Sequence, residues 1–407
     1  MKILENGCVL SPQGFLGAGG HIGIKKEKKD LALIYSEVDA VAVGTFTTNV
    51  VKAAPVLWDK NIVENFPSAR VIAINSGVAN ACTGEVGHQN NELFANYVAD
   101  SFGITSQEVL ICSTGVIGAQ LPMDVIKNGV PKVKQLLKGD QETGIEVARA
   151  IMTTDTKPKH IAVEVEIDGK VVTIGGCCKG SGMIHPNMAT MLGFITTDLH
   201  ISKELLNKAV KEVVAKTYNM VSVDRDTSTN DTVLVLANGM AQNECVNYQG
   251  KAYQTFVDAL YYVNEFLAKA IAGDGEGATK LLEVQVHGAA SHQDAITIAK
   301  SVCTSPLVKT AVYGNDANWG RLFCAMGYSG VDFNPDKVAL FIESEYGFLQ
   351  LVEQGMATEY SEEVATKILS SEHVIAILRL SEGNDTATAW GCDLTYDYIK
   401  INADYRS

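Results

Sequence analysis

The sequence lacks the features that point to a metal site, a disulfide framework or a membrane span. Nine cysteines are scattered along 407 residues without a Cys-x-x-Cys spacing, although Cys177 and Cys178 are adjacent. This pattern predicts buried thiols in a reducing compartment, with no zinc site and no disulfide frame. No apolar run reaches the roughly 20 residues of a spanning helix, and Met1 to Glu5 contain no signal-peptide core. We therefore expect a cytoplasmic chain without a membrane partner.

Positive charge is also scarce, because 33 Lys and Arg stand against 47 Asp and Glu, for a net charge of −14. This excess of acidic groups disfavours binding to nucleic acid or to an anionic membrane surface. Small cationic or zwitterionic substrates remain open. A chain of 407 residues with 46% hydrophobic content predicts two or more lobes with large cores.

Strand-like and helix-like segments alternate along the chain, which predicts an α/β fold. The expected strands are 31–35, 40–47, 69–75, 109–112, 161–167, 171–174, 233–237, 281–287, 338–342, 374–380 and 387–401. The expected helices are 90–102, 123–137, 146–152, 203–216, 253–272 and 293–303, with another opened by 314–321. Asp168-Gly169 predicts a hairpin turn, and Ser202 predicts a helix cap. The glycines of 17–23 predict a turn, because their spacing does not match a dinucleotide fingerprint. The polar tail 401–407 is expected to fray.

The segment from Lys179 to Asp198 is uncharged between its two ends. Its glycines and Pro186 predict a loop, followed by a buried strand over 188–197. Thr190 lies at the junction, after the small residue Ala189. Its hydroxyl can attack the preceding carbonyl carbon, and water can then release the upstream chain. The new α-amine, with a reference pKa of about 7.7–8, can act as the base for the hydroxyl. From residue types alone, a Gly-rich turn with a merely buried Thr190 is the simpler interpretation.

Three further loops are candidates for a site. Residues 113–118 follow a buried strand, where backbone N–H groups can converge as an oxyanion hole, although a strand-to-helix turn also explains them. Residues 222–232 contain three aspartates, but the calcium-loop spacing is missing, so we predict a hydrogen-bonded loop. Glu276 lies among the glycines of 273–280, where it is either a site residue or part of a solvated turn.

The segment 179–192, Lys-Gly-Ser-Gly-Met-Ile-His-Pro-Asn-Met-Ala-Thr-Met-Leu, resembles the self-cleavage segment of the ornithine acetyltransferases. These enzymes are also called the glutamate N-acetyltransferases of arginine biosynthesis. The resemblance extends over nearly the whole chain and includes 29–34, 47–56, 113–118, 226–232, 273–280 and 398–405. Two positions depart from the family pattern: Arg225 stands where many relatives carry Gly, and Ser407 replaces the commoner Thr.

The resemblance implies an αββα sandwich of the self-cleaving Thr-nucleophile kind over residues 1–280, with a C-terminal α/β domain over 281–407. Cleavage between Ala189 and Thr190 gives chains 1–189 and 190–407, and two such pairs form a heterotetramer. The tail of the second chain returns to the active site, against the expectation of fraying.

The resemblance also implies the chemistry. Thr190 takes acetyl from N-acetylornithine and passes it to glutamate in a ping-pong reaction. Thr114 and Gly115 form the oxyanion hole. The substrate site is lined by Thr153, Lys179, Thr190, Glu276, Asn402 and Ser407. Acetyl-CoA is a possible second donor, and no cofactor or metal is implied.

Charge supports two of these assignments, because Lys179 can pair with the α-carboxylate of N-acetylornithine and Glu276 with its δ-ammonium. Two alternatives remain open. One is a self-cleaving aminopeptidase or amidase, in which water resolves the acyl-enzyme. The other is a non-enzymatic α/β binding protein, in which Thr190 has only a structural role.

Overall fold

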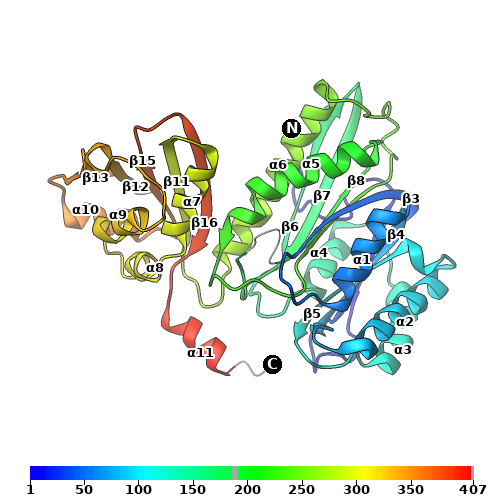
Figure 1. The fold of residues 1–407 in the computed structure, drawn as a ribbon. Coiled ribbons are helices and arrows are strands. Elements are labelled where there is room, and N and C mark those ends of the chain that lie inside the picture. Colours follow the sequence, from blue (N-terminus) through cyan, green and yellow to red (C-terminus); the bar gives the residue numbers. More distant parts are fainter. Residues whose placement is uncertain (186–190, 405–407) are drawn as a thin grey trace.

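The computed structural model describes residues 1–185 and 191–404, and Figure 1 shows their arrangement. The main sheet has nine strands, with the order β1-β6-β7-β8-β10-β3-β4-β5 and with β2 paired to β3. These strands are β1 Lys2–Ile3, β2 Phe15–Gly20, β3 Leu31–Phe46, β4 Ala69–Val78, β5 Val109–Val116, β6 Lys159–Ile167, β7 Lys170–Lys179, β8 Leu192–Thr197 and β10 Thr232–Ala237. The long strand β3 replaces two predicted strands, and its pairing with β4 is irregular between Tyr35 and Ala40.

Alternating side chains divide the main sheet into layers. One set of alternate residues, from both halves of the sheet, shares a single core; examples are Ala32 and Ile34 of β3, Phe194 of β8 and Leu234 of β10. The intervening residues face helices: Leu31 and Leu33 pack with side chains of α2 and α3, and Ile195 and Val235 with those of α5 and α6. The layers therefore run helix, sheet, sheet, helix, and the predicted αββα arrangement is confirmed.

The helices around the main sheet are α1 Ala54–Asn65, α2 Gly84–Phe102, α3 Met123–Lys134, α4 Gln141–Ala150, α5 Lys203–Lys216 and α6 Lys251–Gly273. The α5 helix was predicted with these bounds, and the Ser202 hydroxyl accepts the Leu205 N–H as its cap. The predicted hairpin is also present, with Asp168 and Gly169 at positive φ between β6 and β7.

A second sheet has seven strands in the order β14-β13-β12-β15-β11-β16-β9. They are β9 Val221–Ser222, β11 Leu281–Ala289, β12 Ala339–Ser344, β13 Gly347–Glu353, β14 Met356–Ala357, β15 His373–Arg379 and β16 Asp385–Cys392. Its helices are α7 His292–Cys303, α8 Pro306–Tyr313, α9 Trp319–Gly327 and α10 Glu362–Leu369. Helix α6 packs against both sheets. The domain boundary at residue 280 stays a prediction. Strand β9 belongs to the second sheet but precedes this boundary in the sequence.

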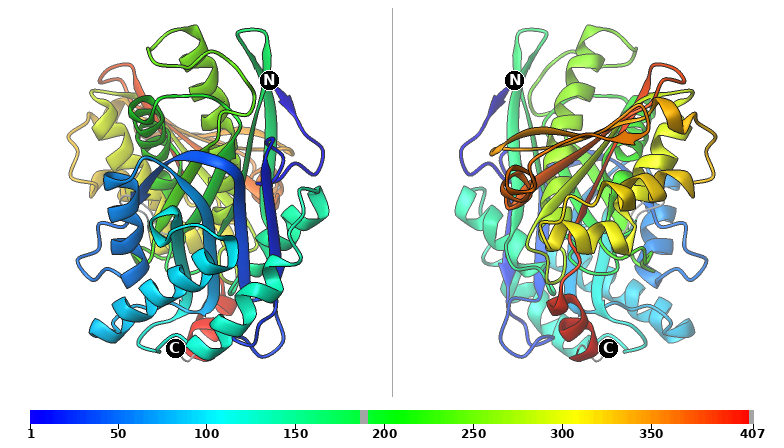
Figure 2. Two further views of the ribbon diagram at one scale, coloured as in Figure 1. Left: turned by 90° about the vertical axis from the view of Figure 1, so that its right-hand side faces the viewer. Right: turned by 90° about the vertical axis from the view of Figure 1, so that its left-hand side faces the viewer.

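The chain closes with α11, Tyr396–Asp404, which lies at the lower end of the molecule in both views of Figure 2. The predicted strand over 387–401 is wrong beyond Cys392. The prediction that the polar tail frays is also wrong for the part of the tail that the structure describes. The chain is tied down between strand and helix, because the Asp393 carboxylate accepts the N–H groups of Thr279 and Lys280 at 2.8 and 3.1 Å. The Thr395 hydroxyl donates to the Gly277 carbonyl at 2.7 Å.

Three other expectations need correction. Residues 15–20 form strand β2 instead of a turn; a Cβ at Gly19 would lie 2.1 Å from the Glu146 carbonyl oxygen of α4, so glycine permits the close packing. Strand β5 continues through Val116, where a loop was expected. Cys82, Cys245 and Cys324 are exposed, whereas the other six thiols are buried.

The described helices include none that is long and apolar enough to cross a membrane. The described part of the chain also contains no group of three or more His, Cys, Asp or Glu side chains that could hold a metal ion.

Candidate active site

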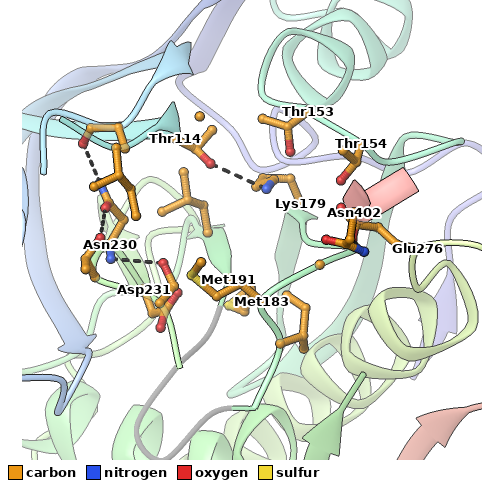
Figure 3. Close-up of a pocket in the computed structure, with 18 residues that line it drawn as sticks. Thr114, Thr153, Thr154, Lys179, Met183, Met191, Asn230, Asp231, Glu276 and Asn402 are labelled. Atoms are coloured by element: carbon orange, nitrogen blue, oxygen red, sulfur yellow. Dashed lines mark hydrogen bonds between the residues drawn. The ribbon is translucent and has the colours of Figure 1, made fainter. Parts of the chain in front are cut away.

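A cavity of about 160 Å³ collects residues that are far apart in the sequence, and we call it the site cavity (Figure 3). Six of the eight residues predicted for catalysis or substrate binding line it: Thr114, Gly115, Thr153, Lys179, Glu276 and Asn402. Thr190 and Ser407, together with Ala189 of the predicted cleavage point, lie outside the described residues. Met191 and Leu192, which directly follow Thr190 in the chain, also line the site cavity.

Thr114 and Gly115 come from the end of β5, next to β4. Gly115 pairs with Gly77, and its φ is +131°. A Cβ at Gly115 would lie 2.3 Å from the Gly77 carbonyl carbon, so only glycine fits there. The Lys179 ammonium donates to the Thr114 hydroxyl oxygen at 3.4 Å. Because that oxygen accepts from lysine, the hydroxyl hydrogen is available to donate into the cavity.

Asn230 holds the β5 side of the cavity in place. Its amide nitrogen donates to the carbonyls of Ala79 at 2.6 Å and Ser113 at 2.9 Å, and its oxygen accepts from the Thr229 hydroxyl at 2.6 Å. The predicted hydrogen-bonded loop over 222–232 is therefore confirmed. The role of Asn230 itself was missed, although the dense run of polar residues was a signal.

The opposite side is organised by a buried ion cluster of Asp155, Lys159 and Asp274. The Lys159 ammonium contacts Asp155 at 2.7 Å and Asp274 at 2.5 Å, and all three side chains are at most 3% exposed. Burial alone would raise the pKa of Asp155, but the ammonium groups of Lys179 and Lys159 hold it well below its usual range. Asp155 and Lys159 are four residues apart, but Asp274 lies on a distant segment, so sequence reasoning did not predict this cluster.

The same cluster fixes the segments that carry the predicted substrate residues. The Asp155 carboxylate accepts the N–H of Gly180 at 2.8 Å and that of Thr153 at 3.0 Å. The Ser181 hydroxyl donates to the Asp274 carbonyl at 2.7 Å. Thr153, Lys179 and the loop that leads to Glu276 thus share one anchor.

Glu276 and Asn402 meet at one end of the cavity (Figure 3). The Asn402 amide donates to the Glu276 carboxylate at 2.8 Å, and the Glu276 N–H donates to the Ser181 carbonyl at 2.9 Å. A Cβ at Gly182 would lie 2.4 Å from the Glu276 carboxyl carbon. Glycine at position 182 therefore leaves room for the carboxylate.

Lys25 is a half-buried lysine close to Lys179 that sequence reasoning missed. Its ammonium donates to the Met152 carbonyl at 2.6 Å. The loop that holds it is fixed by Asp30, whose carboxylate accepts four consecutive backbone N–H groups, from Ile22 to Lys25. Burial, together with the ammonium groups of Lys28 and Lys179, lowers the pKa of Lys25 to about 8 despite the nearby Asp30.

The arrangement has the parts that acyl transfer to and from an amino acid requires. Thr114 and Gly115 offer donors for an oxyanion. Lys179 supplies a positive charge and Glu276 a negative charge in one cavity, which suits a zwitterionic ligand. The fold and the site thus define the class: a layered α/β protein with a site for acyl transfer on a small amino-acid substrate.

Comparison with known proteins gives the family. Residues 17–407 match the model of the ArgJ family. The arginine biosynthesis bifunctional protein ArgJ of Oceanobacillus iheyensis is 49% identical, over all of this chain and 98% of its own length. The protein named ArgJ 1 of Clostridium acetobutylicum is 51% identical over all of this chain and 99% of its own length.

A crystal structure of the Bacillus halodurans ArgJ protein shares 47% identity, with a TM-score of 0.51; it covers 53% of this chain and all of that chain. Ornithine acetyltransferase of Mycobacterium tuberculosis, solved with ornithine, shares 40% identity over 46% of this chain and 99% of its own, with a TM-score of 0.43. The chain belongs to the ArgJ family. The family and enzyme class predicted from the sequence, an acetyltransferase of arginine biosynthesis, are confirmed.

Proposed function

We propose that this chain moves acetyl from N-acetylornithine to glutamate through an acetyl ester on Thr190, and that it also uses acetyl-CoA to make N-acetylglutamate. The single observation that carries the proposal is that six predicted site residues meet in one cavity, beside the two residues that follow Thr190. The names of the full-length relatives, which are bifunctional proteins of arginine biosynthesis, support both activities.

In the first half-reaction the Thr190 oxygen attacks the acetyl carbonyl carbon, and the C–N bond to ornithine breaks. The amine leaves with a proton, and acetyl remains on Thr190 as an ester. The glutamate amino nitrogen then attacks the ester, which releases N-acetylglutamate and restores the hydroxyl. With acetyl-CoA the C–S bond breaks instead, and CoA leaves as the thiol. Thr114 and Gly115 stabilise the oxyanion in each step.

Substrate orientation follows from the charges in the site cavity. Lys179 pairs with the α-carboxylate that ornithine and glutamate share. Glu276, held by Asn402 at 2.8 Å, pairs with the δ-ammonium of ornithine. Thr153 and Ser407 complete the substrate site in this proposal, and no metal or cofactor takes part.

Thr190 becomes reactive when the chain cuts itself between Ala189 and Thr190. The Bacillus halodurans chain corresponds in full to 53% of this one, very nearly the share of residues 190–407, which are 218 of 407. A relative that occurs as a separate chain of that size supports cleavage at this point. A heterotetramer of two cleaved pairs and a cytoplasmic location remain predictions.

Intact mass under denaturing conditions tests the cleavage. We expect wild type to give fragments 1–189 and 190–407, and Thr190→Ala to remain one chain of 43.6 kDa. Thr190→Ser keeps a hydroxyl and should still be cut. A wild-type protein that stays whole and inactive would overturn the proposed nucleophile.

Isotope exchange tests the transfer. Labelled ornithine should enter N-acetylornithine without glutamate, because a ping-pong enzyme completes one half-reaction alone. Net ornithine release should then require glutamate. Acetate release that does not depend on glutamate would instead indicate the hydrolase alternative.

A further inference from the structure

A second hollow, of about 310 Å³, lies where the loops of His185 and Arg225 meet α7, α8 and the end of α9. Arg225, Lys300 and His185 line it together with five Ser or Thr residues and Tyr328, and the described residues that line it include no Asp or Glu. We call it the cationic hollow. Ser305, one of its residues, is also the N-cap of α8, where the partial positive charge of a helix N-terminus adds to the two cations.

The His185 ring contacts the Ser222 hydroxyl at 2.9 Å, and its charged neighbours Lys300 and Arg225 are cationic. Burial, then the charges of Lys300 and Arg225, lower the pKa of His185 to about 4, and burial lowers the pKa of Lys300. Asp224, the neighbour of Arg225, accepts the N–H groups of Met183 and Ile184 at 2.7 and 2.8 Å. Its carboxylate is therefore engaged by backbone donors. In a chain with a net charge of −14, such a hollow favours an anion.

The cationic hollow adjoins the site cavity. Ile184 lines the site cavity, and the next residue, His185, lines the cationic hollow. This short segment is pinned to the Arg225 loop, because Ile184 pairs with Thr227 and the Thr227 hydroxyl donates to the His185 carbonyl at 2.9 Å. The two hollows are therefore neighbours, separated at this point by two consecutive residues.

Of the proposed substrates, only acetyl-CoA needs a second, cationic binding site. Ornithine and glutamate are small and carry carboxylate and ammonium groups that the site cavity matches. Coenzyme A carries phosphate groups, separated from its thioester by a long uncharged arm. The described lining of the site cavity of about 160 Å³ contains one lysine, which the proposed function assigns to the carboxylate. We propose that the cationic hollow binds the phosphate groups of acetyl-CoA when it is the acetyl donor. This inference rests on the proposed function.

A larger hollow between α1 and α5 contains four lysines, and it provides the control. Its cations are mostly engaged: Lys203 and Lys52 donate to the carbonyls of Phe66 and Asn49 at 2.6 and 2.8 Å, and Lys60 lies 3.8 Å from Glu64. Glu204 lines it as well. Lys211 therefore serves as a matched cationic position outside the proposed site.

The test compares donors in Arg225→Gln, Arg225→Lys and the control Lys211→Gln. Arg225 is exposed, so its replacement should not disturb the core. Loss of one charge-assisted phosphate contact should raise KM for acetyl-CoA about tenfold in Arg225→Gln, with partial recovery in Arg225→Lys. KM for N-acetylornithine should not change in any variant. S-acetylpantetheine, which has no phosphate, should serve wild type and Arg225→Gln equally well.

A second experiment tests whether the cationic hollow recognises phosphate groups. In wild type, inorganic diphosphate should raise the apparent KM for acetyl-CoA and leave that for N-acetylornithine unchanged; in Arg225→Gln it should have a weaker effect. The proposal is overturned if Lys211→Gln has the larger effect, if S-acetylpantetheine is affected equally, or if wild type does not use acetyl-CoA. Intact N-acetylornithine transfer in those cases would leave the proposed transfer from N-acetylornithine to glutamate standing, and only the third outcome would also remove the proposed use of acetyl-CoA.

Discussion

The buried ion cluster makes a quantitative prediction. Asp155→Asn keeps the shape of the side chain but leaves Lys159, which is 1% exposed, with Asp274 as its one remaining carboxylate. Removing one partner of a buried pair costs roughly 3–5 kcal/mol. Because Asp274 keeps its contact at 2.5 Å, we expect the lower end, about 3 kcal/mol of unfolding free energy at pH 7.

Urea unfolding in the Thr190→Ala background measures this loss on a single covalent chain, with parent and variant compared at one protein concentration because association shifts apparent stability. Glu146→Gln is the control. Glu146 pairs with Lys29 and Arg149, whose side chains are 38% and 55% exposed, and such surface pairs contribute less than about 1 kcal/mol. A loss below that in Asp155→Asn would refute the idea that the cluster anchors the site.

The pH dependence gives an independent check. The folded pKa of Asp155 lies below its ordinary value, which is about 3.9 in an unfolded chain. Its stabilisation is therefore complete above that pH and is lost as the pH falls through the folded pKa. The stability difference between the parent and Asp155→Asn should shrink only in strong acid. A difference that already fades between pH 7 and 5 would contradict this reasoning.

Three further predictions concern single positions. Gly182→Ala should displace the Glu276 carboxylate, 2.4 Å from the added Cβ, and should raise KM for N-acetylornithine more than KM for acetyl-CoA in steady-state assays. Lys25 has a folded pKa of about 8, below its ordinary 10.4, so the unfolded chain binds more protons between these values; the stability of the parent relative to Lys25→Met should rise with pH across that window in urea titrations. Ser202→Ala should cost about 1 kcal/mol by loss of the α5 cap, with unchanged kinetics.

Local signals explain what could be predicted from the sequence. Helix α5 was predicted to the residue because a capping serine, an apolar stripe and a run of good helix formers coincide within 203–216. The hairpin at Asp168-Gly169 was found for the same reason, since its turn chemistry lies within two residues. The six site residues, in contrast, were named through a family resemblance, and no spacing along the chain brings them together.

The structural features that were not predicted depend on contacts between residues that are far apart in the sequence. Asp155 and Asp274 are separated by more than a hundred residues, so neither sequence neighbourhood shows that they share Lys159. The turn predicted over 17–23 is wrong for the residues of β2, because glycines are typical of turns and the packing of α4 against Gly19 joins distant segments. The strand predicted over 387–401 wrongly includes the start of α11, because Asp393 and Thr395, which follow β16, fix the chain through contacts with the distant segment 277–280.

The contrast between the two ends of the site bears on how one cavity serves two amino acids. The Lys179 end is anchored by buried charges and backbone hydrogen bonds, and the proposed function assigns it to the α-carboxylate that ornithine and glutamate share. The Glu276 end is closed by Asn402 of α11, a helix with no buried residue. An amide can donate to a carboxylate or accept from an ammonium. We infer that the fixed end selects an amino acid and that the lightly held α11 end accommodates its changing side-chain charge.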